Sequence, residues 1–189
     1  GGSVVFAASA AVALFAMSRS DLPDKYVLAD HIAEAKVFRN ELPCDYFNMR
    51  YHRWECSQVE DDPWEWTGLA LGDKECVFDG EKKSLLWLHP PSGGATKRVL
   101  FEGVPPEGVL KLSYGLSDTS VSRKTCFTVV YGDIGPIELC ADEAGKLETY
   151  KLEVPATILT AAVQLTVNSP SHSKRHLCVG GTIYEYGVP

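Results

Sequence analysis

The sequence lacks the short motifs by which many enzymes and nucleotide-binding proteins are identified. It contains no GxSxG, HExxH, GxGxxG or P-loop pattern, which disfavours α/β-hydrolases, zinc proteases and the common nucleotide-binding folds. The DxDxDG calcium loop is also missing. A hydrolase whose acids meet only in the fold stays open as the lowest-ranked hypothesis, because spacing along the chain does not reveal such pairs. The sequence therefore assigns no catalytic residue, no metal ligand and no cofactor.

Positive charge is scarce. Lys and Arg together number 18 against 25 Asp and Glu, which gives a formal net charge of -7. The longest basic clusters are pairs such as Lys82-Lys83 and Arg123-Lys124. Because phosphate binding needs a concentrated basic surface, nucleic acid is not an expected partner.

None of the six cysteines lies in a CxxC pattern, which disfavours zinc knuckles, redox dithiols and attached haem. Their even number favours disulfides in an oxidising compartment, and six reduced core cysteines in the cytosol are the alternative. Six cysteines allow about 15 pairings. One pair can be argued, since a three-residue hairpin loop at 132–134 would place Cys126 opposite Cys140. The remaining disulfide candidates are Cys44, Cys56, Cys76 and Cys178.

Charge is absent from the N-terminal 18 residues. As a helix this segment would be about 27 Å long, enough to cross the hydrocarbon layer of a bilayer. Small residues in its apolar centre, Val4–Met17, would let another helix approach closely. We therefore predict a membrane-anchor helix at 1–20 that contacts the lipid bilayer and integral membrane subunits through residues 4–17. A helix buried in a soluble core is the alternative.

A second, amphipathic helix is expected in the linker at 21–43. Asp21-Leu22-Pro23 is typical of a helix start, and Asn40 and Pro43 would end the helix. Apolar residues such as Tyr26 and Val37 fall near one helical face. Two interpretations stay open, an interfacial stalk and a helix packed on the edge of the following domain.

Residues 44–75 form an irregular, aromatic and acidic stretch. Trp64-Glu65-Trp66 is the predicted contact surface, because exposed large rings with polar neighbours are typical of sugar sites and protein interfaces. Trp54 and Trp87 are further candidate binding residues. The alternative is that these aromatic rings cap a core beneath a long loop.

From Cys76 onward, apolar and polar residues alternate with the period of two that is typical of strands. The clearest runs are at 110–114, 127–131, 150–154 and 163–167, separated by Gly, Pro and Asp turns. We therefore predict a mainly β protein in which residues 44–189 form a two-sheet antiparallel sandwich with jelly-roll-like connectivity.

The series Leu86–Pro91, Val99–Phe101, Leu110–Tyr114 and Gly115–Asp118 resembles the jelly-roll sandwiches of the galactose-binding-like superfamily, which includes bacterial carbohydrate-binding modules. The resemblance covers roughly residues 76–187 and consists of hydrophobic positions and turns. It implies architecture, and no sugar-binding residue is carried over by motif.

Three functions are compatible with these features. The first is a non-catalytic, single-pass membrane protein whose sandwich lies on the periplasmic or extracellular side and serves as an accessory subunit of a larger assembly. The second is a membrane-tethered carbohydrate-binding module that binds a glycan. The third is the hydrolase described above.

Overall fold

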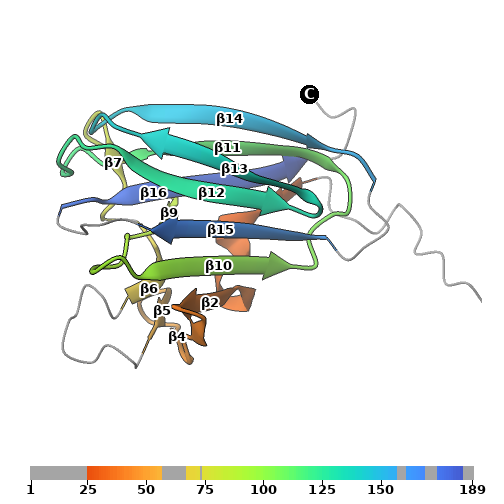
Figure 1. Cartoon of the computed structure of the whole chain (residues 1–189). Helices are drawn as coiled ribbons and strands as arrows, with labels where there is room; N and C mark the ends of the chain where they lie inside the picture. Colours follow the sequence, from red (N-terminus) through yellow and green to blue (C-terminus); the bar gives the residue numbers. More distant parts are fainter. Residues whose placement is uncertain (1–24, 57–66, 73, 157–160, 169–173, 185–189) are drawn as a thin grey trace, which may run out of the picture.

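The computed structural model describes residues 25–56, 67–72, 74–156, 161–168 and 174–184, and these residues form two antiparallel sheets that face each other (Figure 1). The elements are β1 (Lys25–Val27), the 3₁₀ helix η2 (Leu28–Glu34), β2 (Lys36–Arg39), β3 (Leu42–Pro43), β4 (Tyr46–Asn48), β5 (Arg53–Glu55), β6 (Thr67–Leu71), β7 (Val77–Phe78), β8 (Glu81–Lys82), β9 (Leu86–Trp87), β10 (Thr96–Glu102), β11 (Gly108–Leu116), β12 (Thr125–Tyr131), β13 (Ile134–Ala141), β14 (Leu147–Val154), β15 (Ala162–Asn168) and β16 (Leu177–Tyr184).

The larger sheet has the strand order β14-β11-β16-β9-β6-β5-β4, with β1 paired to β16. The smaller sheet has the order β13-β12-β15-β10-β2-β3, and β7 and β8 form a separate hairpin. Strands β3 and β4 follow each other in the chain and end the two sheets on the same side of the sandwich. The mainly β, two-sheet architecture predicted from the sequence is confirmed.

The core lies between the sheets and explains the alternation in the sequence. Leu110 and Leu112 point into it from β11, Phe127 and Val129 from β12, while Leu152 contributes from β14. Each such side chain contributes about 1.5–3 kcal/mol when it is removed from water. The burial pattern of β12 alternates strictly along its length, because one face of each sheet packs inward.

The segment 21–43 differs from the predicted long helix. Its described part contains one short 3₁₀ helix, Leu28–Glu34, between β1 on the large sheet and β2 on the small sheet. β-Branched and aromatic residues at 26–27 and 37–38 suit strands, and pairing with β16 and β10 satisfies their backbone groups. Asn40 ends a strand rather than a helix, since Asn40 and Glu41 both have positive φ and form the two-residue turn between β2 and β3.

The predicted membrane-anchor helix at Val4–Met17 lies outside the described residues. Among the residues that the structure does describe, no helix is long and apolar enough to cross a membrane.

Three disulfides join Cys44 to Cys56, Cys76 to Cys178 and Cys126 to Cys140. Cys126 lies directly opposite Cys140, in the register argued from the sequence. The loop itself is shorter than expected, because Tyr131 pairs with Ile134 and leaves a two-residue turn. A bulge between Val129 and Tyr131 shifts the register by one residue and restores the pairing of the cysteines.

Candidate functional site

A cross-strand row on the outer face of the large sheet forms the base of the candidate site. Arg53 of β5 pairs with Ala70 of β6, Ala70 pairs with Trp87 of β9, and Trp87 pairs with Cys178 of β16. Directly opposite residues in antiparallel strands project to the same face. The row therefore places a guanidinium, a methyl group, an indole and a disulfide sulfur side by side, away from the main core.

The disulfide between Cys178 and Cys76 fixes the chain segment that covers this row, here called the covering segment, which runs from 74 to 82. Cys76, Cys178, Ala70, Phe78 and Trp87 form a second, smaller hydrophobic cluster outside the sandwich. The β7–β8 hairpin that follows Cys76 is also hydrogen bonded to the two residues that follow β11. Ser117 Oγ accepts from the Val77 amide at 3.1 Å, and the Asp118 carboxylate accepts from the Asp79 and Gly80 amides. Together these contacts fix the segment on the outer face.

A cavity of about 430 Å³, here called the outer-face pocket, opens between the covering segment and the β4–β5 turn. Its size is that of small-molecule sites in proteins. Trp87 and Ala70 are buried at its base, Lys74 and Glu75 come from the covering segment, and the β4–β5 turn supplies the opposite wall. The full lining is Arg50, Tyr51, His52, Arg53, Ala70, Leu71, Lys74, Glu75 and Trp87.

The wall formed by β4 and β5 is rich in cations. Arg53 Nε donates to Glu55 Oε1 at 2.9 Å, and the same oxygen accepts from Asn48 Nδ2 at 3.0 Å. The Arg50 and Arg53 guanidinium carbons lie 5.4 and 5.0 Å from the centroid of the Tyr51 ring. Contacts of this length are cation–π interactions that hold a ring and a guanidinium together.

Three rings pack around the base of the pocket. Trp87 lies 5.1 Å from His89 and 5.7 Å from His176, measured between ring centroids. Burial lowers the pKa of His176, and the nearby Glu75 carboxylate only partly opposes this effect. Because the neutral imidazole is favoured, His176 adds no positive charge beside Trp87.

The structure separates the residues that the sequence grouped as a contact surface. Trp64, Glu65 and Trp66 lie outside the described residues, so their role stays a prediction. Trp54 packs against the inner core, and its Nε1 donates to the Ile32 carbonyl oxygen at 2.8 Å. Trp87 is 4% exposed and forms the base of the pocket. Both rings pack against buried residues, and a role in binding stays a prediction for each.

Four residues that line the outer-face pocket were not predicted from the sequence: Arg50, His52, Arg53 and Lys74. A signal was present, because Arg50-Tyr51-His52-Arg53 places two guanidiniums and an imidazole around one aromatic ring. An aromatic ring separates the first guanidinium from the other two groups, so the pattern does not stand out as a run of basic residues. Lys74 gave no signal, since only the Cys76–Cys178 disulfide fixes its segment to the sheet.

A second hollow of about 800 Å³ lies beside the β7–β8 hairpin and is lined in part by acids. Its Asp118 carboxylate already accepts hydrogen bonds from two hairpin amides, and the Lys83 ammonium lies 2.6 Å from Glu81 Oε2. These groups hold the hairpin in place.

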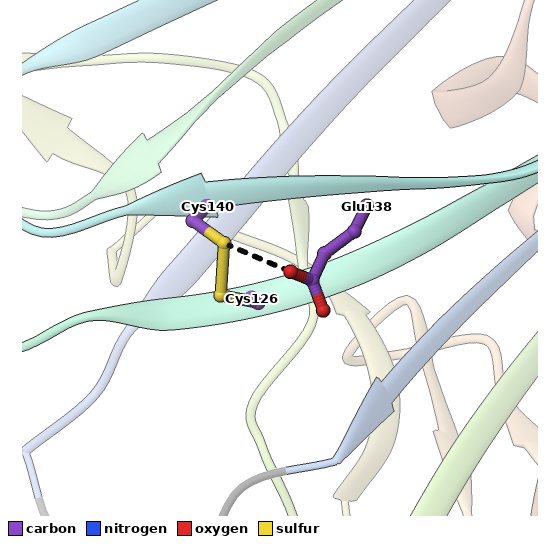
Figure 2. Close-up of side chains that lie close together, drawn as sticks. All are labelled: Cys126, Glu138 and Cys140. Atoms are coloured by element: carbon purple, nitrogen blue, oxygen red, sulfur yellow. Dashed lines mark hydrogen bonds between the residues drawn. A yellow bond between two sulfur atoms is a disulfide. The ribbon is translucent and has the colours of Figure 1, made fainter.

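Within the described part of the chain, one group of side chains has the spacing of a metal site, Cys126, Glu138 and Cys140 (Figure 2). The two sulfurs are joined in a disulfide, and Glu138 Oε1 lies 3.8 Å from Cys140 Sγ. A thiolate, not a disulfide sulfur, is the usual metal ligand. The oxidised protein therefore offers only one good ligand there.

Comparisons with known proteins do not identify a family. No protein-family model and no curated protein matches the sequence. Among solved structures, the chain is similar to an isomalto-dextranase of Arthrobacter globiformis T6 complexed with panose, with 15% identity, a TM-score of 0.38, and coverage of 61% of this chain and 20% of that one. It is also similar to a family GH115 4-O-methyl-alpha-glucuronidase with specificity for decorated arabinogalactans, with 14% identity, a TM-score of 0.37, and coverage of 60% and 15%. The chain spans about a fifth or less of the length of these enzymes, and likeness at this level supports no argument about function.

Proposed function

We propose that the protein is a non-catalytic accessory subunit of an extracytoplasmic membrane assembly, and that it binds its partner through the side of the sandwich where β3 and β4 end the sheets. Exposed apolar side chains support this proposal. Six large hydrophobic residues are well exposed in the described part of the chain, and four of them fall within 42–51. These four, here called the 42–51 patch, are Leu42 (55%), Tyr46 (56%), Met49 (69%) and Tyr51 (54%).

The 42–51 patch suits a protein partner because it lies on the edge strands β3 and β4 and on the β4–β5 turn, next to a disulfide. The Cys44–Cys56 disulfide joins the start of β4 to the end of β5. A fixed edge loses little conformational entropy on binding, and concentrated apolar side chains are typical of contact sites. Arg50 adjoins the patch, so we expect a partner surface that is apolar and bears acidic groups at its rim.

Anchoring in the membrane is the second part of the proposal. The three disulfides favour an oxidising compartment on the periplasmic or extracellular side. Residues 1–20 are proposed to insert in the bilayer, with 4–17 against integral membrane subunits. Deleting 1–20 should release a folded, soluble sandwich, and persistence of the truncated protein in the membrane fraction without detergent would contradict the anchor.

Site-specific photocrosslinking in the native membrane tests the partner contact. A photoreactive residue at Met49 should crosslink to one defined protein at fixed stoichiometry. The same residue at Val121, which is 39% exposed, is the matched control and should give no such product. Tyr46→Ser with Met49→Ser should dissociate the assembly, whereas Val121→Ser with Leu147→Ser should not. Equal crosslinking from both positions would contradict the proposal.

A carbohydrate-binding module is the second candidate, favoured by the outer-face pocket. Tyr51 presents an exposed ring at the pocket wall, and exposed aromatic rings with polar neighbours suit the stacking of sugar rings. If the protein is such a module, we expect its strands to be connected as in the jelly rolls of the galactose-binding-like superfamily. A glycan array with the wild-type chain and Tyr51→Ala tests it, since loss of a specific signal in the variant is expected and no signal from either protein would reject it.

A further inference from the structure

The charge of the outer-face pocket is opposite to that of the whole protein. The chain carries a formal net charge of -7. The described residues that line the pocket nevertheless include Arg50, Arg53 and Lys74 as cations and only Glu75 as an acid. Cations brought together in one hollow repel each other, and a bound anion relieves that repulsion.

The Arg53 guanidinium and the backbone of both walls are positioned before any ligand arrives. Arg53 is 25% exposed on a strand, and its Nε is bonded to the Glu55 carboxylate, which is itself nearly buried. Lys74 lies two residues before Cys76, whose disulfide fixes this wall to β16. The opposite wall is fixed by the Cys44–Cys56 disulfide. A site with both walls fixed in this way avoids much of the entropic cost of binding.

The donors and the ring together select the chemistry of the ligand. A guanidinium has a planar fork that matches a carboxylate, and an ammonium adds a point charge. The Tyr51 side chain is well exposed, and the Arg50 and Arg53 guanidinium carbons lie over its ring. The base of the pocket, Trp87 and Ala70, is apolar and buried. This combination fits a molecule that has both a ring with an apolar face and a carboxylate on that ring.

An acidic saccharide fits the pocket better than an acidic peptide. The pocket lies on the face of the large sheet, over the row Arg53, Ala70 and Trp87. Peptides that bind by strand addition need the main-chain groups of a sheet edge. Here, charged side chains around an aromatic wall provide the recognition, and the cavity of about 430 Å³ is suited to a small molecule or to the end of a chain.

We propose that the outer-face pocket binds uronic-acid-containing saccharides, with the sugar carboxylate held by Arg50, Arg53 and Lys74 and the sugar ring against Tyr51. This inference rests on the second candidate function and specifies its ligand. It is independent of the partner contact proposed for the 42–51 patch, although Tyr51 belongs to both surfaces.

Titration calorimetry of the full chain in detergent with matched oligosaccharides tests the proposal. Oligogalacturonate should bind at least about tenfold more tightly than a neutral oligogalactoside of the same length, since hydrogen bonds between charged partners are roughly twice as strong as those between neutral ones. Affinity for the acid should fall as salt is raised. Arg50→Gln with Lys74→Gln should remove the preference for acid. Arg123→Gln with Lys124→Gln removes the same charge from exposed positions elsewhere and should leave binding unchanged.

The outcomes distinguish a failure of the acidic-ligand inference from a failure of the carbohydrate-binding candidate. Equal affinity for the acidic and neutral sugars would overturn the acidic-ligand inference and leave the carbohydrate-binding candidate standing. No binding of either sugar would overturn both. Tighter binding of polyglutamate than of oligogalacturonate would overturn the saccharide in favour of an acidic protein segment. Preference for a sulfated neutral oligosaccharide over the uronate would overturn the carboxylate assignment.

Discussion

Removing the Cys76–Cys178 disulfide should destabilise the protein more than removing Cys44–Cys56. The two bonds close loops with sequence separations of 102 and 12 residues. In the loop-entropy description, the stabilisation grows with the logarithm of loop length, to about 4.7 kcal/mol for the longer loop and about 2.8 kcal/mol for the shorter. The cysteines of both bonds are buried, so the packing loss on replacement by alanine is similar and largely cancels in the comparison.

Urea unfolding of Cys76→Ala/Cys178→Ala and Cys44→Ala/Cys56→Ala measures this difference. The first variant should lose about 2 kcal/mol more of its unfolding free energy than the second. It should also lose ligand affinity at the outer-face pocket, because Lys74 and Glu75 depend on Cys76 for their position. An equal or smaller loss of stability would refute the loop-closure reasoning. Unchanged affinity would show that the disulfide does not position this wall.

Three further predictions follow from single side chains. The pKa of His176 in the folded protein lies below the ordinary value of 6.5, so the unfolded state takes up the proton first as the pH falls. The melting temperature should therefore drop as the pH falls through and below 6.5. His176→Gln should flatten that dependence. Burial raises the pKa of Tyr26 to about 12 from 10.0, so Tyr26→Phe should remove one late-ionising group from the ultraviolet titration. Stability should decline between these pH values, because the unfolded state ionises first. Trp54→Phe loses the hydrogen bond to the Ile32 carbonyl and should cost about 1 kcal/mol in urea unfolding.

Alternation in the sequence was sufficient to predict the strands of the core. In β12, for example, Phe127, Val129 and Tyr131 are buried and their neighbours are half-exposed, as the period of two requires. The pairing of Cys126 with Cys140 was predictable because a hairpin needs only a local register. The expected three-residue loop was wrong and the register still held, since the bulge after Val129 adds the residue that the shorter turn lacks.

The segment 21–43 was mispredicted because the apolar residues of two short strands and a 3₁₀ helix also fit the period of one long helix. Tyr26, Ala29, Ala33 and Val37 fall on one side of an ideal helix. In the fold, Tyr26 and Val37 instead lie on strands that pair with β16 and β10. The partner strands β16 and β10 are more than fifty residues away in the chain, so the local sequence pattern could not indicate this pairing. Long-range pairing satisfies the backbone there and overrides the helical pattern.

The outer-face pocket depends on registers that no local pattern specifies. Arg53, Ala70 and Trp87 meet because three strands, separated by long stretches of chain, pair in one particular register. A shift of one residue in β5 would turn Arg53 inward and bring Trp54 to the outer face. The bulge between Trp54 and Glu55, where Gly68 is the additional residue of β6, is one determinant of that register. A Cβ on Gly68 would lie 2.8 Å from Cys56 Sγ, so glycine at this position of the bulge makes room for the disulfide that fixes the cationic wall.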